Sequence, residues 1–330
     1  MAAMRLHAVG QSLSLDMLPR PSPQEHQVLV EVLACGVCRT DLHVLDGELP
    51  DPHFPLTPGH EIVGRVVAKG RSVANIGLGD RVGVPWLAET CGVCRYCRQG
   101  MENLCEKAQF TGYTVDGGYA QYAVANASYC LPVPARYSDT QAAPLLCAGL
   151  IGYRAYRAAG SGNSLGLYGF GAAAHLLAQI AVAEGRKVFA FTKGADEETQ
   201  RFAMSLGASW AGNSDEACPE PIDAAIIFAP VGALVPTALA AIRPGGRVVC
   251  AGIHMSDIPS FPYRVLWGER SICSVANLTR ADGAAFMRLA ARIDLRPHVE
   301  VFDLSQANNA LQRLRNGMLT GAAVLQPNRG

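Results

Sequence analysis

One segment of the chain, residues 165–185, constrains the fold more than any other. Its apolar residues 165–168 predict a β-strand, the sequence GFGAAAH predicts a turn, and residues 172–184 predict an Ala- and Leu-rich helix that Gly185 ends. A strand, a glycine turn and a helix in succession form the first half of a βαβ unit. The segment therefore predicts an α/β fold with a parallel sheet.

The same alternation of strands and helices continues along the chain. We predict a helix over residues 197–206 and further strands over residues 187–191, 223–228 and 245–253. Repeated βα units of this kind build a doubly wound parallel sheet.

The turn of this segment matches a dinucleotide-binding fingerprint. Gly169 permits the tight turn, Gly171 lets the backbone approach a pyrophosphate, and Ala174 supplies the small side chain where helix packs on strand. Phosphates would bind at the N-terminus of the helix that follows. We therefore expect a nicotinamide dinucleotide as cofactor.

The end of the second predicted strand indicates which dinucleotide. A fold that prefers NAD usually has an acidic residue there, but this chain has Thr192 and Lys193, and Asp196 is the first acid. A hydroxyl and an ammonium group can hold a 2′-phosphate. We expect NADP to be preferred over NAD, unless Lys193 is only a solvated surface lysine.

The first half of the chain has a different character. Apolar, β-branched runs over residues 28–34 and 62–68, bounded by Gly and Pro, predict strands of a β-rich domain. Three parts are expected: a β-rich catalytic domain at 1–147 with a lobe at 88–110, a nucleotide domain at 148–277, and a C-terminal segment at 278–330. This last segment carries an amphipathic helix and a strand that we assign to the first domain.

Four of the eleven cysteines lie close together in the lobe. They follow the pattern C-x2-C-x2-C-x7-C, which brings four thiolates to one tetrahedral ion, although one ferredoxin spacing begins in the same way. The surrounding residues are too polar to form a core, so the ion would supply the folding free energy. We predict a closed, structural zinc site made by Cys91, Cys94, Cys97 and Cys105.

A second set of candidate ligands is scattered through the first domain. Cys38 lies in CGVCRTDLH, His60 and Glu61 lie in PGHEIVG, and Cys147 lies in PLLCAGL. Two cysteines and a histidine leave a fourth position for water or substrate, as a catalytic zinc requires. Taken singly, Cys147 could be a small core residue and His60 an ordinary buried histidine.

These motifs, in this order, resemble those of the zinc-dependent medium-chain alcohol dehydrogenases. The resemblance covers essentially the whole chain, and the cysteine quartet with the C-x-T-D-x-x-H and G-H-E motifs is its most specific part. It implies a GroES-like catalytic domain built from both chain ends, a Rossmann domain between them, two zinc ions and a homodimer or homotetramer. It also implies hydride transfer between primary alcohols or aldehydes and NAD(P), with secondary alcohols and ketones as the wider class.

The resemblance also assigns roles to individual residues. Cys38, His60 and Cys147 correspond to the catalytic zinc ligands, and Glu61 to a residue that exchanges with the substrate oxygen. The remaining correspondences are Asp41 behind His60, Thr40 and His43 in the proton relay, Arg39 at the cofactor pyrophosphate, and Trp86 in the wall of the substrate pocket.

Two positions depart from the family pattern. Gly321 is followed by Ala322 where the family often has a phosphate-binding arginine, so cofactor binding would depend more on Arg39 and the helix N-terminus. Leu49 stands where related microbial enzymes often have an aromatic residue. We expect a wider pocket, open to longer or aromatic primary alcohols and aldehydes.

Composition excludes several other functions. The chain has 28 Lys and Arg against 28 Asp and Glu, so no basic face is available for nucleic acid or anionic membranes. The longest apolar stretch, residues 142–153, is too short to cross a bilayer, and Arg5 and His7 interrupt any secretory signal. We expect a cytoplasmic protein that acts on a small molecule.

Two alternative functions are considered. A zinc-independent quinone reductase of the same superfamily would lack both ligand sets, whereas a catalytically silent member could retain the fold. Neither alternative requires the Thr40 and His43 pair. No role is assigned to the other five cysteines, Cys35, Cys130, Cys218, Cys250 and Cys273.

Overall fold

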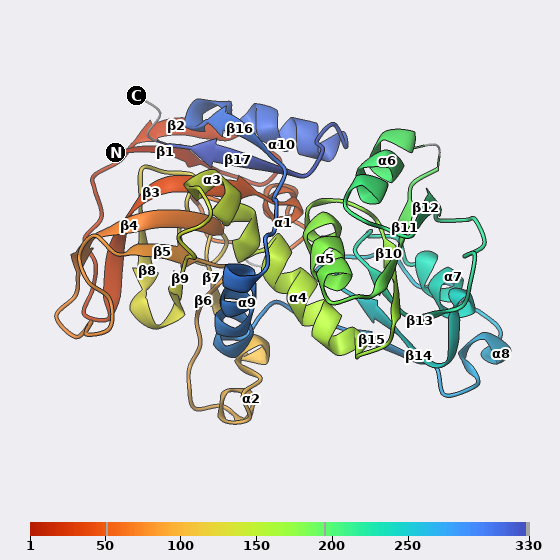
Figure 1. The fold of residues 1–330 in the computed structure, drawn as a ribbon. Coiled ribbons are helices and arrows are strands. Elements are labelled where there is room, and N and C mark those ends of the chain that lie inside the picture. The colour runs from red at the N-terminus through yellow and green to blue at the C-terminus, as the bar shows by residue number, and fades with distance from the viewer. Residues whose placement is uncertain (51, 195, 328–330) are drawn as a thin grey trace. The chain divides into compact units, whose positions relative to one another are not determined.

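The computed structural model describes residues 1–50, 52–194 and 196–327. The chain forms two compact units, one of residues 1–147 and 277–330 and the other of residues 148–276. Both chain ends belong to the first unit, so the second unit is a continuous insertion in its sequence (Figure 1). No helix in the described part of the chain is long and apolar enough to cross a membrane.

The inserted unit contains a six-stranded, wholly parallel sheet. In spatial order its strands are β12 (Trp210–Asn213), β11 (Lys187–Thr192), β10 (Ser164–Tyr168), β13 (Ile222–Ile227), β14 (Ile242–Cys250) and β15 (Ser271–Ser274). The order reverses direction at β10, as in a Rossmann-type fold, which confirms the predicted doubly wound sheet.

The helices of the inserted unit pack against this sheet, and α4 and α5 also pack against each other. They are α4 (Ala148–Ala159), α5 (Ala172–Ala183), α6 (Glu197–Ser205), α7 (Leu234–Ala241) and the short α8 (Tyr263–Leu266). The ring of Tyr168 stacks on that of Phe191 at 4.1 Å in the core. The strand predicted over residues 245–253 is present, but it begins and ends three residues earlier, at Ile242–Cys250.

The β-rich unit is built on a seven-stranded sheet. Six strands lie in the order β16-β17-β3-β4-β5-β9, and β8 pairs with β3. Their bounds are β3 (Gln27–Val37), β4 (Glu61–Lys69), β5 (Arg81–Val84), β8 (Tyr122–Asn126), β9 (Leu131–Pro132), β16 (Val299–Asp303) and β17 (Ala322–Gln326). Shorter strands form two separate pairs, β1 (Ala2–Arg5) with β2 (Ser14–Met17) and β6 (Leu87–Glu89) with β7 (Gln109–Phe110).

Helical segments of this unit lie between and beside the strands. The α-helices are α1 (Arg39–Leu45), α2 (Arg95–Arg98), α3 (Asp139–Ala142), α9 (Arg280–Arg292) and α10 (Ala307–Arg315). The 3-10 segments are η1 (Glu102–Leu104), η2 (Ala127–Tyr129), η3 (Ala143–Leu146) and η4 (Leu304–Gln306).

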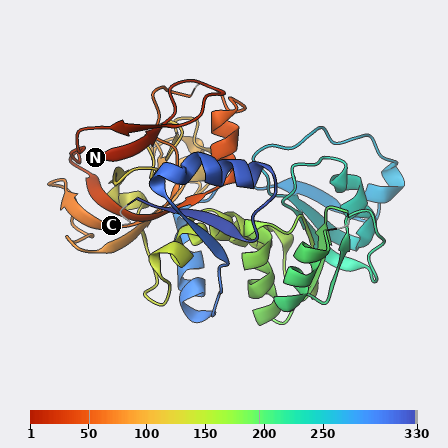
Figure 2. The ribbon, with the colours of Figure 1, turned by 90° about the horizontal axis from the view of Figure 1, so that it is seen from above.

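The C-terminal segment completes the sheet of the β-rich unit. Strand β17 pairs antiparallel with β3, which places Ala323 opposite Val37, and it pairs in parallel with β16. Helix α10 packs beside both C-terminal strands (Figure 2). Residues from the two ends of the chain therefore share one apolar core.

Candidate active site and metal centres

The thiol of Cys38 lies between strand β3 and helix α1. Cys38 caps α1, and its backbone N–H donates to the carboxylate of Asp41 at 2.8 Å, which completes a capping box. The thiol of Cys147, just after η3, lies 3.7 Å from that of Cys38. Two cysteines 109 residues apart in sequence thus converge on one point.

His60 and Glu61 reach the same point from the start of β4. Both are buried, at 0% and 3% exposure. Glu61 lies directly opposite Gly36 of β3 in the antiparallel register. A Cβ atom at residue 36 would lie only 1.8 Å from Oε2 of Glu61, so the glycine leaves the space that this carboxylate occupies.

These four residues could hold one metal ion. One ligand atom from each of Cys38, His60, Glu61 and Cys147 lies within 4.8 Å of all the others. Both ring nitrogens of His60 are buried with no hydrogen-bond partner in the described structure, a costly arrangement that a metal ion bound to one of them would partly relieve. Two thiols, an imidazole and a carboxylate are donors that suit zinc.

The electrostatics of the cluster depend on burial and on Asp41. Burial lowers the pKa of His60, but the nearby Asp41 carboxylate, at 3.2 Å, and the Cys38 thiol together outweigh it and hold this pKa well above its ordinary value. The hydrogen bond with Cys147 lowers the pKa of the Cys38 thiol, whereas burial raises the pKa of Glu61. The cluster therefore already favours a thiolate at Cys38.

Helix α1 presents the other residues that the sequence singled out. Arg39 is exposed, and Thr40 is half-buried with its hydroxyl 3.8 Å from the sulfur of Cys38. His43 is 8% exposed, and its Nδ1 contacts the carboxylate of Glu48. Glu48 was not identified from the sequence as a candidate site residue.

A Schellman motif at the end of α1 explains this contact. The N–H of Gly47 donates to Val44 and that of Glu48 to His43, with Gly47 at a φ of 71°. This motif brings the side chains at the first and last positions of the turn together. The sequence HVLDGE, with glycine after the helix, contained the signal.

Aromatic rings line one side of the cluster. Trp86 packs edge-on against the imidazole of His60, with ring centroids 4.9 Å apart, and stacks on Phe110 and Tyr113. Trp86 is 7% exposed. Leu49 is half-buried and packs against the apolar core of the same unit.

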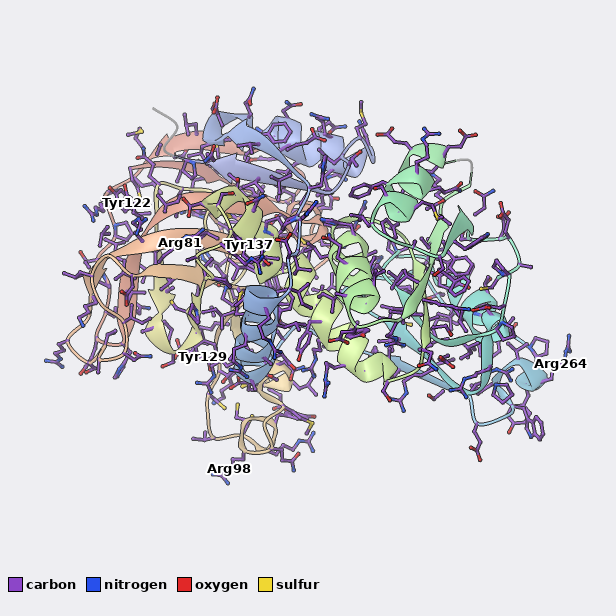
Figure 3. All side chains as sticks on the ribbon, viewed as in Figure 1. Arg81, Arg98, Tyr122, Tyr129, Tyr137 and Arg264 are labelled. Carbon is purple, nitrogen blue, oxygen red and sulfur yellow. The ribbon has the colours of Figure 1, made fainter. Side chains whose placement is uncertain are left out.

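The cysteine quartet forms the second metal-binding cluster. The sulfur atoms of Cys91, Cys94, Cys97 and Cys105 also lie within 4.8 Å of one another. Short-range N–H···S contacts organise them, such as Cys94 N–H to the sulfur of Cys91 at 3.4 Å. Arg98, at the end of α2, lies at the tip of this lobe, which projects from the β-rich unit (Figure 3).

In the inserted unit, the predicted turn joins β10 to α5. Gly169 has a φ of 88°, and a Cβ there would approach the backbone of Ala229 to 2.9 Å. Gly171 caps α5 and has open space where a Cβ would be, while Ala174 is fully buried. The turn therefore has the shape that the fingerprint requires.

The structure corrects the expectation for Thr192. This side chain is 2% exposed, and its hydroxyl donates to the carbonyl of Gly212 at 3.3 Å and accepts from Gln200 at 3.0 Å. The hydroxyl faces inward because β11 is buried on both faces, so it is not available to a phosphate. Lys193 is exposed.

Two family models match the chain. The alcohol dehydrogenase GroES-like domain matches residues 24–135, and the zinc-binding dehydrogenase domain matches residues 172–292. The chain belongs to the zinc-dependent medium-chain alcohol dehydrogenase family. This dehydrogenase is an oxidoreductase that acts on alcohols.

Individual relatives support the same family over nearly the whole chain. The dehydrogenase is 47% identical to the probable alcohol dehydrogenase AdhA of Mycobacterium tuberculosis over 93% of this chain and 90% of that protein. It is 36% identical to an alcohol dehydrogenase of Geobacillus stearothermophilus over 99% of each chain. The structure of a Sorghum bicolor cinnamyl alcohol dehydrogenase matches with a TM-score of 0.89, at 26% identity over 98% of this chain and 97% of that one.

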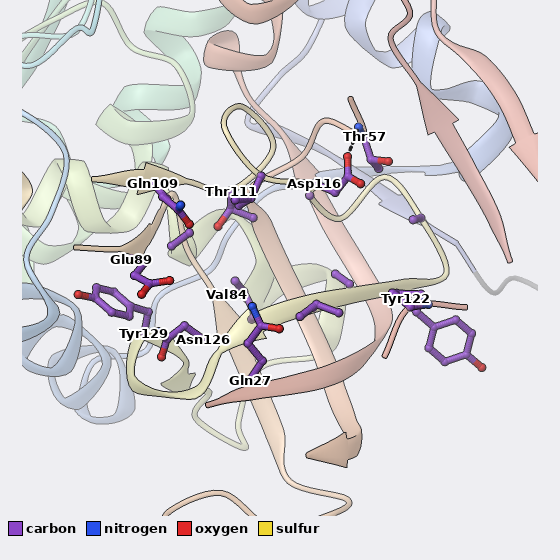
Figure 4. A pocket seen from close by; sticks show the side chains of 18 of the residues that line it. Gln27, Thr57, Val84, Glu89, Gln109, Thr111, Asp116, Tyr122, Asn126 and Tyr129 are labelled. Atoms are coloured by element: carbon purple, nitrogen blue, oxygen red, sulfur yellow. Dashed lines mark hydrogen bonds between the residues drawn. The ribbon is translucent and has the colours of Figure 1, made fainter. Parts of the chain in front are cut away.

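The dehydrogenase also has a cavity in its β-rich unit that is separate from both clusters. This cavity, of about 370 Å³, lies between β8 and the β6–β7 pair and is lined by Glu89, Gln109, Thr111, Asp116 and Tyr129, among others (Figure 4). None of its described lining residues is a candidate ligand of either metal centre.

Proposed function

We propose that this alcohol dehydrogenase binds a catalytic zinc ion through Cys38, His60 and Cys147, with Glu61 as a ligand that can exchange with substrate. The observation that carries the proposal is the convergence of these four buried or half-buried groups from three separate segments of the β-rich unit. When bound there, zinc acts as a Lewis acid that favours the deprotonated alcohol or polarises an aldehyde carbonyl.

The residues of α1 would handle the proton. The hydroxyl of Thr40, 3.8 Å from the sulfur of Cys38, would accept the proton from the alcohol. His43 would pass this proton towards solvent, and the carboxylate of Glu48 holds Nδ1 of His43. The tautomer with a proton on Nδ1 makes Nε2 the nitrogen that accepts the next proton.

The inserted unit would bind the nicotinamide dinucleotide at its glycine turn. Gly171 leaves space for the pyrophosphate at the N-terminus of α5. Arg39 is exposed, as a residue that contacts a cofactor requires, and its role at the pyrophosphate stays part of this proposal. We retain NADP as the preferred cofactor on the strength of Lys193 alone. Solved relatives carry either cofactor, since a Geotrichum candidum acetophenone reductase is in complex with NAD and a Sinorhizobium meliloti relative is bound to NADP.

The cysteine quartet would hold a second, structural zinc ion. Its four thiols leave no open position for a substrate, as in closed structural sites. The thiols of both clusters must stay reduced to bind metal, which supports a cytoplasmic location.

A homo-oligomer is supported by the surface of the inserted unit. Strand β15 is an edge strand of the parallel sheet, and Tyr263 and Trp267 nearby are 72% and 66% exposed. An open sheet edge and large exposed aromatic side chains in the same unit each favour association with a second copy. Light scattering on the wild type and on Trp267→Glu would test this, with dissociation expected in the variant.

Metal content and steady-state kinetics would test the proposed activity together. We expect about two zinc ions per chain, turnover of longer and aromatic primary alcohols because Leu49 is small, and kcat/KM higher for NADP⁺ than for NAD⁺. A Lys193→Glu variant should shift this ratio towards NAD⁺. Zinc-replete protein that oxidises no alcohol and reduces no aldehyde would instead support a catalytically silent member of the fold.

A further inference from the structure

A buried tyrosine outside the described motifs lies beneath the proposed catalytic zinc ligands. Tyr119 is fully buried, and its hydroxyl donates a hydrogen bond of 2.9 Å to Oδ2 of Asp41, a residue 78 positions away in sequence. The pKa of Tyr119 lies well above its ordinary value because of burial and of the neighbouring Asp41 charge. The hydroxyl therefore stays protonated and acts as a donor.

The tyrosine ring is packed against the segment that carries His60. The backbone N–H of Tyr119 donates to the carbonyl of Pro58 at 3.0 Å. A Cβ atom at Gly59, which has a φ of 97°, would lie only 2.3 Å from the ring. Glycine at residue 59 thus lets the ring lie directly against the backbone next to His60.

The two oxygens of Asp41 have separate partners. Oδ2 accepts from the Tyr119 hydroxyl and from the backbone N–H of Cys38 at 2.8 Å. Oδ1 lies 3.2 Å from Nδ1 of His60, close enough for an ion pair but not aligned for a hydrogen bond. Two donors on Oδ2 hold the carboxylate in place, so Oδ1 stays 3.2 Å from Nδ1 of His60, which leaves Nε2 free to bind a metal ion.

We propose that Tyr119 is a positioning residue of the catalytic metal site, which acts through Asp41 to orient His60 and so to retain the metal ion. This inference rests on the proposed zinc ligands Cys38, His60 and Cys147. Groups behind metal ligands typically contribute 10- to 100-fold to metal affinity. Tyr119 is one hydrogen bond further from the ion than Asp41. Its removal should therefore have a smaller effect on metal affinity, of roughly 3- to 10-fold.

The rate of zinc release to a chromogenic chelator tests this proposal without measuring activity. Release from the wild type should show two phases, and the phase that is absent from Cys147→Ser belongs to the catalytic site. In Tyr119→Phe, which removes only the hydroxyl, this phase should be roughly 3- to 10-fold faster, and the other phase should be unchanged.

A matched control separates positioning from a loss of stability. Tyr137 is another buried tyrosine of the same unit, and its hydroxyl donates to the carbonyl of Ala290 at 2.7 Å, away from both clusters. Tyr137→Phe should lower the unfolding temperature as Tyr119→Phe does, yet leave both release phases as in the wild type.

A double-mutant cycle with Asp41→Asn tests whether the two residues act through one route. We expect the effect of Tyr119→Phe on release to shrink markedly in the Asp41→Asn background. Equal release from Tyr119→Phe and the wild type, or full additivity in the cycle, would overturn the inference. A wild type that has no release phase dependent on Cys147 would instead refute the proposed metal site itself.

Discussion

The two cysteine clusters of the β-rich unit are held in place in opposite ways. The quartet comes from 15 consecutive residues, 91–105, and its cysteines are organised by local N–H···S contacts on a projecting lobe. The other cluster joins segments far apart in sequence, and it rests on buried groups such as Asp41. A site made by residues close together in the sequence needs its ion to keep its shape. A site made by residues far apart in the sequence is instead held in shape by the core of the unit.

Removal of a ligand from the buried cluster should have the largest effect, and mainly on activity. Cys147→Ser should lower kcat/KM at least about a thousandfold, because the ion supplies several kcal/mol of transition-state stabilisation. The unfolding temperature should fall by less than in a quartet variant, because the core positions this cluster and only the stabilisation from bound metal is lost. Kinetics and calorimetry on Cys147→Ser and on Cys130→Ser, a thiol outside both clusters, would measure the contrast.

Removal of a ligand from the quartet should have the reverse effect. Cys97→Ser should destabilise the β-rich unit by at least about 3 kcal/mol, because metal binding supplies folding free energy to the lobe. Limited proteolysis should then cleave within residues 91–105, and Cys218→Ser in the inserted unit should remain resistant. An intact lobe in metal-free Cys97→Ser would show that the quartet does not depend on its ion for its shape, and the contrast between the two clusters would then be wrong.

A substitution behind the buried cluster tests how tightly the core defines it. Gly36→Ala places a methyl group where the carboxylate of Glu61 lies. Overpacking of this kind costs about 1–3 kcal/mol, and we expect kcat/KM to fall about tenfold as Glu61 is displaced. Gly152→Ala in α4 is the control, because a Cβ there has its nearest neighbour at 3.4 Å. Unchanged kinetics in Gly36→Ala would mean that Glu61 has no defined position.

The smallest effect concerns the attachment of the lobe to the rest of its unit. Glu102 accepts from the side chain of Arg280 at 2.6 Å and from its backbone N–H at 2.8 Å, at the N-terminus of α9. Arg280 also lies over the ring of Tyr129. Glu102→Gln should cost about 1 kcal/mol at pH 7, a modest amount because the arginine is half exposed to solvent.

This cost should depend on pH in a defined direction. Burial raises the pKa of Glu102, but the hydrogen bonds from Arg280 outweigh burial and hold this pKa below its ordinary value of 4.5. The stabilisation is therefore complete above that value and is lost as the pH falls through the lowered pKa. Urea unfolding at several pH values should show wild type and Glu102→Gln converging in acid. Glu106→Gln, an exposed acid of the same lobe, should match the wild type throughout.

The sequence predicted those features that local spacing determines. The quartet, the glycine turn and the alternation of strands and helices depend on residues close in the chain, and the structure places each as expected. The contact of Glu48 with His43 was equally local, and glycine at the helix end could have revealed it.

The remaining features depend on tertiary packing that no spacing encodes. Tyr119 reaches Asp41 only because Gly59 and Gly118 clear space for its ring and for the neighbouring Cys35 and Ile62 side chains. The hydroxyl of Thr192 faces inward because its strand is covered on both sides, which a residue type cannot indicate. A polar residue at the end of a strand can therefore bond within the core instead of binding a ligand, and its type alone does not show which.

The return of the C-terminal segment to the β-rich unit has a consequence for synthesis on the ribosome. The inserted unit is complete once residue 276 has emerged, whereas the sheet of the β-rich unit waits for β16 and β17 near the end of the chain. Domains generally fold as units, so we expect the later-encoded domain to fold first. During that interval the thiols of Cys38 and Cys147 lack their completed core, and they would be most open to oxidation in the nascent chain.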